Sequence, residues 1–175
     1  MRVFIALLFS KNNKLQVFKQ LKNLANNYKG NYTSYNNLHL TLYYIGEVNN
    51  ILLQKVKQCI KSIKSSSFVY KTSGMDCFKI RQNNCLVHLK IKNNSNLKEL
   101  HDKVIVSLKN TGIKINIQKF TPHITLGRKV EINLADLKNI KTLPIELKAN
   151  RISIMESKRN NGDLVYREID YCLLK

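Results

Sequence analysis

Apolar residues follow two spacings along the first quarter of the chain, and each spacing predicts a type of element. Val3 to Phe9 is a continuous apolar run, which is typical of a central strand buried on both faces. From Lys14 to Tyr28 the apolar residues recur at helical spacing, and Gly30 follows as a stop signal. A polar stretch then leads to a second strand, from Leu38 to Ile45. The pattern therefore predicts a strand, a helix and a second strand.

The same two spacings predict further elements in the middle of the chain. Helical spacing marks Leu52 to Ile63 and Leu97 to Leu108, and the second of these segments ends at Gly112. Strands are expected near Phe68–Lys71 and Cys85–Ile91. Helices and strands therefore mix along the chain, which indicates an α+β class.

The end of the chain has the pattern of a β-hairpin. Strand-like segments cover Arg151–Glu156 and Leu164–Tyr171, and they flank the turn residues Asn160, Asn161 and Gly162. Asn-Gly is a strong turn signal because both residues tolerate positive φ. We therefore expect two antiparallel strands here.

Two short motifs have the form His-x-Thr-aliphatic, His39-Leu40-Thr41-Leu42 and His123-Ile124-Thr125-Leu126. Each follows a strand, a helix and a loop, at 36 positions from Val3 and 37 positions from Leu86. This repeat predicts two pseudo-symmetric lobes within one domain over residues 1–175. We expect each lobe to be a mostly antiparallel sheet with helices outside, and the cleft between the lobes to hold an active site.

Length and charge restrict the class of protein. A chain of 175 residues buries roughly 70 % of its unfolded surface, so its core needs no disulfide or metal. The 30 Lys and Arg residues against 11 Asp and Glu give a net charge of +19, which favours RNA or another phosphate-rich partner. The alternative is a biased Lys, Asn and Ile composition with lysines spread over solvated surfaces.

The cysteines and the apolar runs indicate where the chain resides. Cys59, Cys77, Cys85 and Cys172 show no Cys-x-x-Cys spacing and read as free core thiols. No apolar run approaches the ~20 residues that span a membrane, and the first residues are too few for a signal peptide. We therefore expect a cytoplasmic protein that has no membrane contact and is a monomer.

Paired His-x-Thr strands suit acid–base chemistry on a phosphodiester. Residues two positions apart in a strand share a face, so His39 lies beside Thr41 and His123 beside Thr125. One neutral imidazole deprotonates the attacking oxygen and the other, protonated, donates to the leaving oxygen, while the Thr hydroxyls bind phosphoryl oxygens. No carboxylate lies near either motif at metal-ligand spacing, so we expect no metal and no cofactor. The alternative is that each His is a surface or core residue.

The residues around both motifs resemble a known family. Asn37 to Leu42, followed by Ile45-Gly46-Glu47-Val48, and Phe120 to Arg128 are similar to the signature segments of the two-histidine phosphoesterase superfamily. Within it the chain looks most like the RNA 2′,3′-cyclic phosphodiesterases, also called 2′-5′ RNA ligases. The similarity extends to the first strand, to Met155-Glu156-Ser157 and to Tyr166.

The resemblance implies an activity and roles for the motif residues. His39 and His123 would be the acid–base pair, with the analogy favouring His39 as acid, and Thr41 and Thr125 would bind the phosphate. The substrate would be RNA or a nucleotide with a 2′,3′-cyclic phosphate, hydrolysed to a 2′-phosphate. The same groups would allow the reverse joining of ends through a 2′-5′ bond, although water competes strongly.

Three further residues are candidates for substrate contact. Arg128 follows the second motif and is expected to bind phosphate, with a structural ion pair as the alternative. By alternation Tyr43 shares the face of Thr41 and is a candidate for stacking on a base, with core packing as the alternative. His88 precedes the third helix and is a candidate base contact, with a plain surface position as the alternative.

Two other functions fit the same motifs. The first is a phosphodiesterase of the same fold that acts on a different ester, such as a 2′-5′ oligonucleotide or a cyclic phosphate of ADP-ribose. The second is a non-catalytic RNA-binding module, which would bind RNA in a salt-dependent way without turnover.

Overall fold

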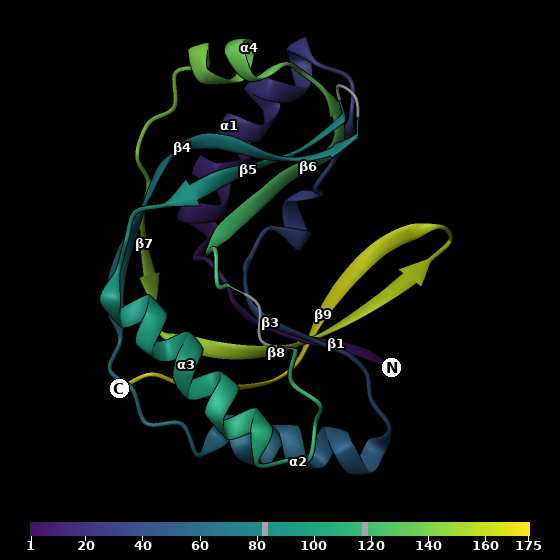
Figure 1. Ribbon diagram of the computed structural model, residues 1–175, viewed down its shortest axis with the longest axis vertical. Coiled ribbons are helices and arrows are strands. Elements are labelled where there is room, and N and C mark those ends of the chain that lie inside the picture. The colour runs from purple at the N-terminus through teal and green to yellow at the C-terminus, as the bar shows by residue number, and fades with distance from the viewer. Residues whose placement is uncertain (82–83, 117–118) are drawn as a thin grey trace.

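Two antiparallel sheets face each other in the computed structural model, which describes residues 1–81, 84–116 and 119–175. Helices cover their outer sides (Figure 1). The predicted α+β class with a sheet in each lobe is confirmed.

The first sheet carries the first motif. Over the described residues its strands lie in the order β3 (Leu40–Glu47), β1 (Arg2–Leu7), β8 (Arg151–Asn160) and β9 (Asp163–Leu173). β8 and β9 form the predicted hairpin, and its turn places Asn161 and Gly162 at positive φ. The hairpin extends beyond the rest of the sheet (Figure 1), and its strands are longer than the apolar pattern indicated.

The second sheet carries the second motif in a matching position. Its described strands lie in the order β2 (Asn31–Tyr32), β6 (His123–Glu131), β5 (Asn84–Ile91), β4 (Phe68–Arg81) and β7 (Glu146–Ala149). The order β6-β5-β4-β7 corresponds to β3-β1-β8-β9, so each motif lies on the strand beside the first strand of its repeat. This arrangement agrees with the predicted pseudo-symmetry.

The lobes are not the two halves of the chain. α1 (Lys11–Asn27) follows a strand of the first sheet but covers the second sheet, together with α4 (Leu134–Asn139) (Figure 1). α3 (Ser95–Lys109) follows a strand of the second sheet but covers the first, together with α2 (Asn50–Lys61). Since α1 and α3 each cross to the other sheet, the two halves interlock.

Side-chain caps determine where the helices begin. The Ser10 hydroxyl accepts from the backbone N–H of Asn13, so α1 starts three residues before the apolar spacing indicates. The side chains of Asn49 and Asn94 cap α2 and α3 in the same way. The short helix η1 (Tyr35–Asn37) lies directly before the first motif. Among the described helices, none has the length and apolar character needed to cross a membrane.

Some elements lacked a signal in the sequence. β4 continues to Arg81, well past the predicted Lys71. Its register with β5 shifts between Thr72 and Met75, where Gly74 has a φ of +102°. The bulge breaks the alternation of side chains that marks a strand. β2, β7, α4 and η1 are too short to show a period.

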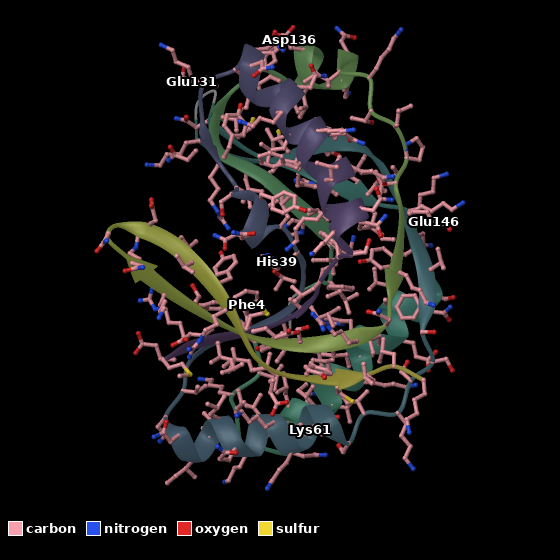
Figure 2. The ribbon with its side chains drawn as sticks, turned by 180° about the vertical axis from the view of Figure 1, so that it is seen from behind. Phe4, His39, Lys61, Glu131, Asp136 and Glu146 are labelled. Carbon is pink, nitrogen blue, oxygen red and sulfur yellow. The ribbon has the colours of Figure 1, made fainter. Side chains whose placement is uncertain are left out.

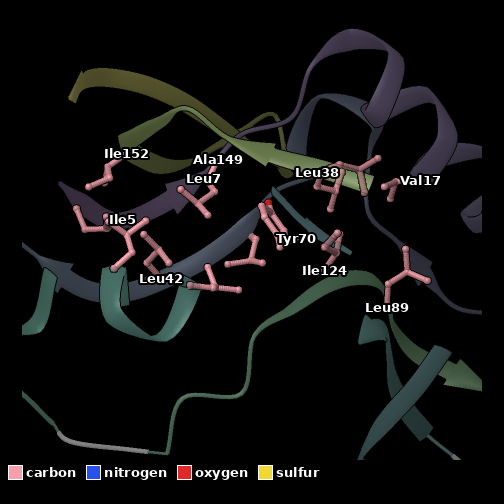
Figure 3. Packing of buried hydrophobic residues seen from close by; sticks show 14 of the residues in the cluster. Ile5, Leu7, Val17, Leu38, Leu42, Tyr70, Leu89, Ile124, Ala149 and Ile152 are labelled. Carbon is pink, nitrogen blue, oxygen red and sulfur yellow. The ribbon is translucent and has the colours of Figure 1, made fainter. Parts of the chain in front are cut away.

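One hydrophobic cluster runs through both sheets and their helices. It includes Ile5 and Leu7 of β1, Ile124 of β6 and Val17 of α1, and Tyr70 lies among them (Figure 3). A separate small cluster, Phe4, Ala6 and Met155, lies on the opposite face of the first sheet. That face is the one that presents the first motif.

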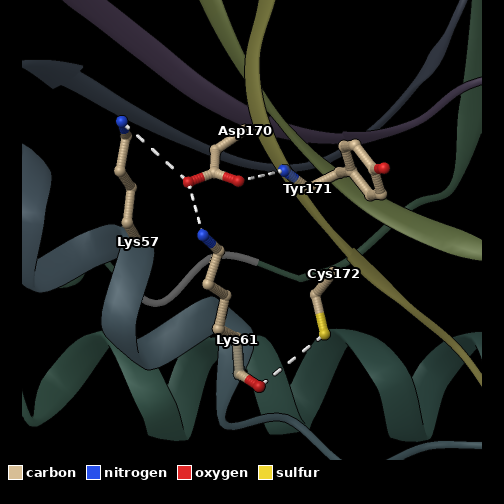
Figure 4. Close-up of polar contacts among 5 residues, drawn as sticks. All are labelled: Lys57, Lys61, Asp170, Tyr171 and Cys172. Atoms are coloured by element: carbon tan, nitrogen blue, oxygen red, sulfur yellow. Dashed lines mark hydrogen bonds and ion pairs between the residues drawn. The ribbon is translucent and has the colours of Figure 1, made fainter.

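Polar contacts join α2 to the outer strand of the first sheet (Figure 4). The Asp170 carboxylate on β9 lies 2.9 Å from Lys61 Nζ and 3.9 Å from Lys57 Nζ, and it accepts a hydrogen bond from the backbone N–H of Tyr171. The Cys172 thiol donates to the Lys61 carbonyl. These contacts tie the helix to the strand at the far side of the sheet from His39.

Candidate functional site

His39 lies immediately before β3, and both nitrogens of its imidazole have a partner. Nδ1 lies 2.7 Å from the backbone oxygen of Asn37, and Nε2 lies 2.9 Å from Thr41 Oγ1. A carbonyl oxygen can only accept, so Nδ1 carries the hydrogen, and Nε2 of the neutral ring accepts from the Thr41 hydroxyl. His39 and Thr41 therefore lie on one face of the first sheet, as alternation predicts.

His123 is the first residue of β6 and repeats this arrangement. Its Nδ1 lies 2.8 Å from the backbone oxygen of Thr121, which precedes it by two residues as Asn37 precedes His39. Nδ1 again donates, which leaves Nε2 available to exchange a proton. Among the described residues the Thr125 hydroxyl has no hydrogen-bond partner, so it is free to bind a ligand.

The two motifs lie close enough to interact electrostatically. Burial lowers the pKa of His39 to about 4, against the opposing effect of its hydrogen bond to Asn37. Electrostatic interactions with His123, Lys14 and Arg128 lower it further. His39 is therefore neutral at pH 7 when no anion is bound.

Aromatic side chains surround the His39 ring on the side of the first sheet. The ring centroids of Phe4 and Tyr166 lie 4.9 Å and 5.2 Å from that of His39. Figure 2 shows His39 and Phe4 between the two sheets. These rings keep water from the imidazole, which is the physical reason for its lowered pKa.

On the second sheet, Phe78 and His88 pack beside His123. Phe78 stacks on His88 with centroids 4.3 Å apart, and both rings meet His123 edge-on, at 5.2 Å and 5.1 Å. His88 is only 3 % exposed, whereas Phe78 is 40 % exposed. The His88 ring is buried beneath Phe78. It is therefore neither the base contact that was predicted nor the surface residue given as the alternative. Phe78 is the exposed aromatic side chain at this position.

Tyr43 does not lie on the face of His39 and Thr41, which corrects the prediction from alternation. Ala6 pairs with Thr41 and Ile5 pairs with Tyr43, so β3 has a bulge between Thr41 and Tyr43. Tyr43 therefore turns to the core side with Ile5, and its hydroxyl accepts from the backbone N–H of Asn116. The structure therefore supports core packing, the alternative given for Tyr43.

Tyr44 takes the position on the site face that alternation assigned to Tyr43. It pairs with Phe4, whose ring contacts His39, and its side chain is 55 % exposed. Strict alternation hides this residue, since only the bulge brings it to this face.

Arg128 also reaches the site through a shift in register. His88 pairs with Thr125 and Val87 with Gly127, so β6 carries one extra residue there. The bulge returns Arg128 to the side of His123 and Thr125, where its charge acts on His39. Within the described residues Arg128 forms no ion pair, so the structural ion pair is not observed and the guanidinium remains free for an anion.

Asn37 connects the first motif to β9 and was given no role by the sequence. Its side chain donates to the Leu164 carbonyl at 2.6 Å and accepts from the Tyr166 N–H at 3.1 Å, while its carbonyl holds His39. The residue is buried, and it thereby orients the imidazole against the ring of Tyr166. An Asn two positions before the motif His is the only sequence signal for it.

The lowered pKa values predict a loss of stability in mild acid. Burial also lowers the pKa of His88 to about 4, and His123 contributes in the same direction. Below pH 6.5 the unfolded chain binds protons that the folded protein excludes at His39 and His88, so stability falls as the pH falls and is constant above about pH 7. We expect the free energy of unfolding to decrease by about 1 kcal/mol per pH unit for each histidine between pH 6.5 and 5.

Urea titrations across this pH range measure the effect. His88→Phe keeps the stack on Phe78 and should remove about half of the pH dependence of the free energy of unfolding between pH 6.5 and 5. His101→Gln replaces an imidazole that contacts neither motif histidine and should leave this pH dependence unchanged. A slope that is the same in His88→Phe and the natural chain contradicts the expectation.

Known proteins resemble this chain in both sequence and fold. A family model described as the 2′-5′ RNA ligase superfamily matches residues 13–161. A Thermotoga maritima protein named RNA 2′,3′-cyclic phosphodiesterase is 27 % identical over 98 % of this chain and 95 % of its own length.

The described residues hold no group of three or more His, Cys, Asp or Glu side chains arranged as metal ligands.

Solved structures share the fold at low identity. The crystal structure of E. coli LigT complexed with 3′-AMP covers 99 % of this chain and 97 % of its own, with a TM-score of 0.82 and 19 % identity. The crystal structure of TT0787 from Thermus thermophilus covers 99 % and 98 %, with a TM-score of 0.80 and 17 % identity. At these identities the likeness concerns the fold.

Proposed function

The chain belongs to the 2′-5′ RNA ligase superfamily, and from this premise we propose that it hydrolyses 2′,3′-cyclic phosphate ends of RNA or nucleotides to 2′-phosphates. The observation that carries the proposal is the matched setting of the two imidazoles. Each donates through Nδ1 to the carbonyl two residues before it, and His123 acts electrostatically on His39. The name of the Thermotoga maritima relative supports the choice of substrate.

In the proposed reaction a water molecule attacks the phosphorus in line with the 3′ oxygen. The P–O bond to the water forms while the P–O3′ bond breaks. One imidazole takes the proton of the water at Nε2, and the other donates its Nε2 proton to the 3′ oxygen. The Thr41 and Thr125 hydroxyls and Arg128 stabilise the negative charge on the non-bridging oxygens.

The lowered pKa of His39 sets a condition on its role. We assign the acid role to His39 and the base role to His123, as the family analogy favours. Because His39 is neutral in the unliganded site, the acid role requires that the bound phosphate anion raise its pKa and bring a proton to Nε2.

The surrounding aromatic side chains suit a nucleoside. Phe78, beside His123 on the second sheet, and Tyr44, beside Phe4 on the first sheet, are both exposed, and either ring offers a face on which a base can stack. RNA is favoured over other phosphoesters because the charge of +19 attracts a polyanion.

Hydrolysis of a 2′,3′-cyclic nucleotide in the presence of EDTA tests the function. We expect turnover with and without the chelator, and a 2′-phosphate as the product by phosphorus NMR. A panel with a 2′-5′ oligonucleotide and an ADP-ribose cyclic phosphate tests the substrate alternatives. Salt-dependent RNA binding without turnover of any of these substrates would contradict the enzyme and favour a binding module.

A further inference from the structure

We propose that Lys14 and Arg151 form a second anion-binding site beside His39, which holds the phosphodiester one nucleotide upstream of the terminal cyclic phosphate. The inference rests on the proposed function and narrows its substrate class. It implies that the preferred substrate is an oligonucleotide end rather than a mononucleotide.

The sheet places Arg151 on the same face as His39. Ser153 of β8 pairs with Ala6 of β1, and Ala6 pairs with Thr41 of β3, so these side chains share the face of the first motif. Arg151 lies two residues before Ser153 and therefore points to this face as well. The strands that carry His39 and Arg151 are separated by β1 alone, which puts their backbones about 10 Å apart. One nucleotide with its phosphate can span that separation.

Arg151 is held in place from several sides. Its guanidinium lies 3.2 Å from the Glu168 carboxylate and 5.2 Å from the centroid of the Tyr171 ring. Glu168 in turn accepts a hydrogen bond from the buried Ser153 hydroxyl at 2.5 Å. These contacts fix the guanidinium before any ligand arrives, which reduces the entropy lost on binding.

Lys14 approaches the same place from α1. Its Nζ donates to the Asn36 carbonyl at 3.4 Å and lies 5.7 Å from the centroid of the Tyr35 ring. Asn36 precedes His39 by three residues, so this contact holds the ammonium beside the first motif. Burial lowers the pKa of Lys14, and the charge of Arg151 lowers it further, in agreement with this position.

The charges at this place do not balance. Glu168 compensates Arg151, but among the described residues Lys14 has no carboxylate partner. A half-buried ammonium held near a guanidinium repels it, and an anion between them relieves that repulsion. A phosphodiester supplies one negative charge and two oxygens that accept hydrogen bonds, which matches one ammonium and one guanidinium.

A pair of substrates that differ by one nucleotide, and hence by one phosphodiester, tests the site. We compare a mononucleotide 2′,3′-cyclic phosphate with the dinucleotide that ends in the same nucleotide. For the natural chain we expect kcat/KM to be about tenfold higher for the dinucleotide. A dinucleotide with an uncharged methylphosphonate linkage should lose this advantage, because only the charge of the linkage has changed.

Lys14→Met removes the ammonium and keeps the apolar stem. We expect the ratio of the two kcat/KM values to fall from about ten to near one in this variant. Lys19→Met is the matched control, since it removes one charge from an exposed position on the same helix and should keep the ratio. A dinucleotide advantage that persists in Lys14→Met, or that is absent from the natural chain, overturns the proposed site while the proposed function stands.

A binding measurement decides the case in which no substrate turns over. The dissociation constants of a mononucleotide 2′-phosphate and of the dinucleotide with the same end are measured by calorimetry. Tighter binding of the dinucleotide, lost in Lys14→Met and kept in Lys19→Met, supports the anion site even without catalysis. Equal binding of the two ligands overturns it.

Discussion

Replacing either His39 or His123 by glutamine is expected to lower kcat for a 2′,3′-cyclic phosphate by ~10²–10⁴-fold, the contribution of a positioned proton transfer. Glutamine keeps a polar side chain of similar size but cannot exchange a proton near neutral pH. Because one histidine gives a proton while the other takes one, the double variant should lose less than the product of the two single losses. Initial rates with each purified variant measure the effect.

The control for these variants is a histidine outside the site. His101 stacks on Phe120, which lies three residues before His123, with ring centroids 4.0 Å apart, and it contacts Asp102. Among the described residues it forms no hydrogen bond or ring contact with either motif histidine. His101→Gln should retain kcat within about threefold, and melting temperatures identify any variant that has lost its fold. If His39→Gln or His123→Gln also retains kcat within this range, the acid–base assignment is wrong.

Removal of the hydroxyl from Thr41 or Thr125 is the second largest expected effect. Valine has nearly the same shape as threonine, so Thr→Val removes one hydrogen-bond donor at the phosphate and little else. We expect kcat to fall by about 10²-fold for each, comparable to the loss of one oxyanion donor. In the unliganded site Thr41 also donates to Nε2 of His39, so Thr41→Val should shift the pH dependence of kcat/KM, whereas Thr125→Val should not.

The serine variants separate this role from packing. Thr41→Ser and Thr125→Ser keep the hydroxyl but lose a methyl group, so they should retain most of the activity of the natural chain. If the serine and valine variants lose activity equally, the methyl groups matter through packing, and the proposed binding of phosphate by the hydroxyls is contradicted.

Much of the fold was predictable because its strong signals are local. The apolar runs predicted β1, β3, β5 and the long helices, and Asn161-Gly162 predicted the hairpin between β8 and β9. The second part of β4 was missed because the bulge at Gly74 interrupts its alternation. The crossing of α1 and α3 to opposite sheets was also missed, because an apolar helix face does not specify which sheet it packs on.

In the candidate site, too, features local to one strand were predictable, whereas features that depend on the neighbouring strand were not. The sharing of a face by His39 and Thr41 follows from two residues in one strand, and the structure has this arrangement. The expected position of Tyr43 is wrong, and the position of Arg128 depends on a shift in register, because both residues follow a bulge. A bulge depends on the neighbouring strand, so alternation within one strand cannot predict it.

By itself, the amino-acid sequence determined the α+β class and the two His-x-Thr strands, and it predicted the acid–base chemistry that we propose for them. Spacing and residue type are sufficient for these features, since they depend on the alternation of one strand and the pKa of one kind of side chain. Tertiary structure alone decided that His123 interacts electrostatically with His39, that Phe78 stacks on His88, and that the charge of Arg151 acts on Lys14 beside the motif. These contacts join residues that are distant in the chain, and only the packing of the two sheets and their helices brings them together.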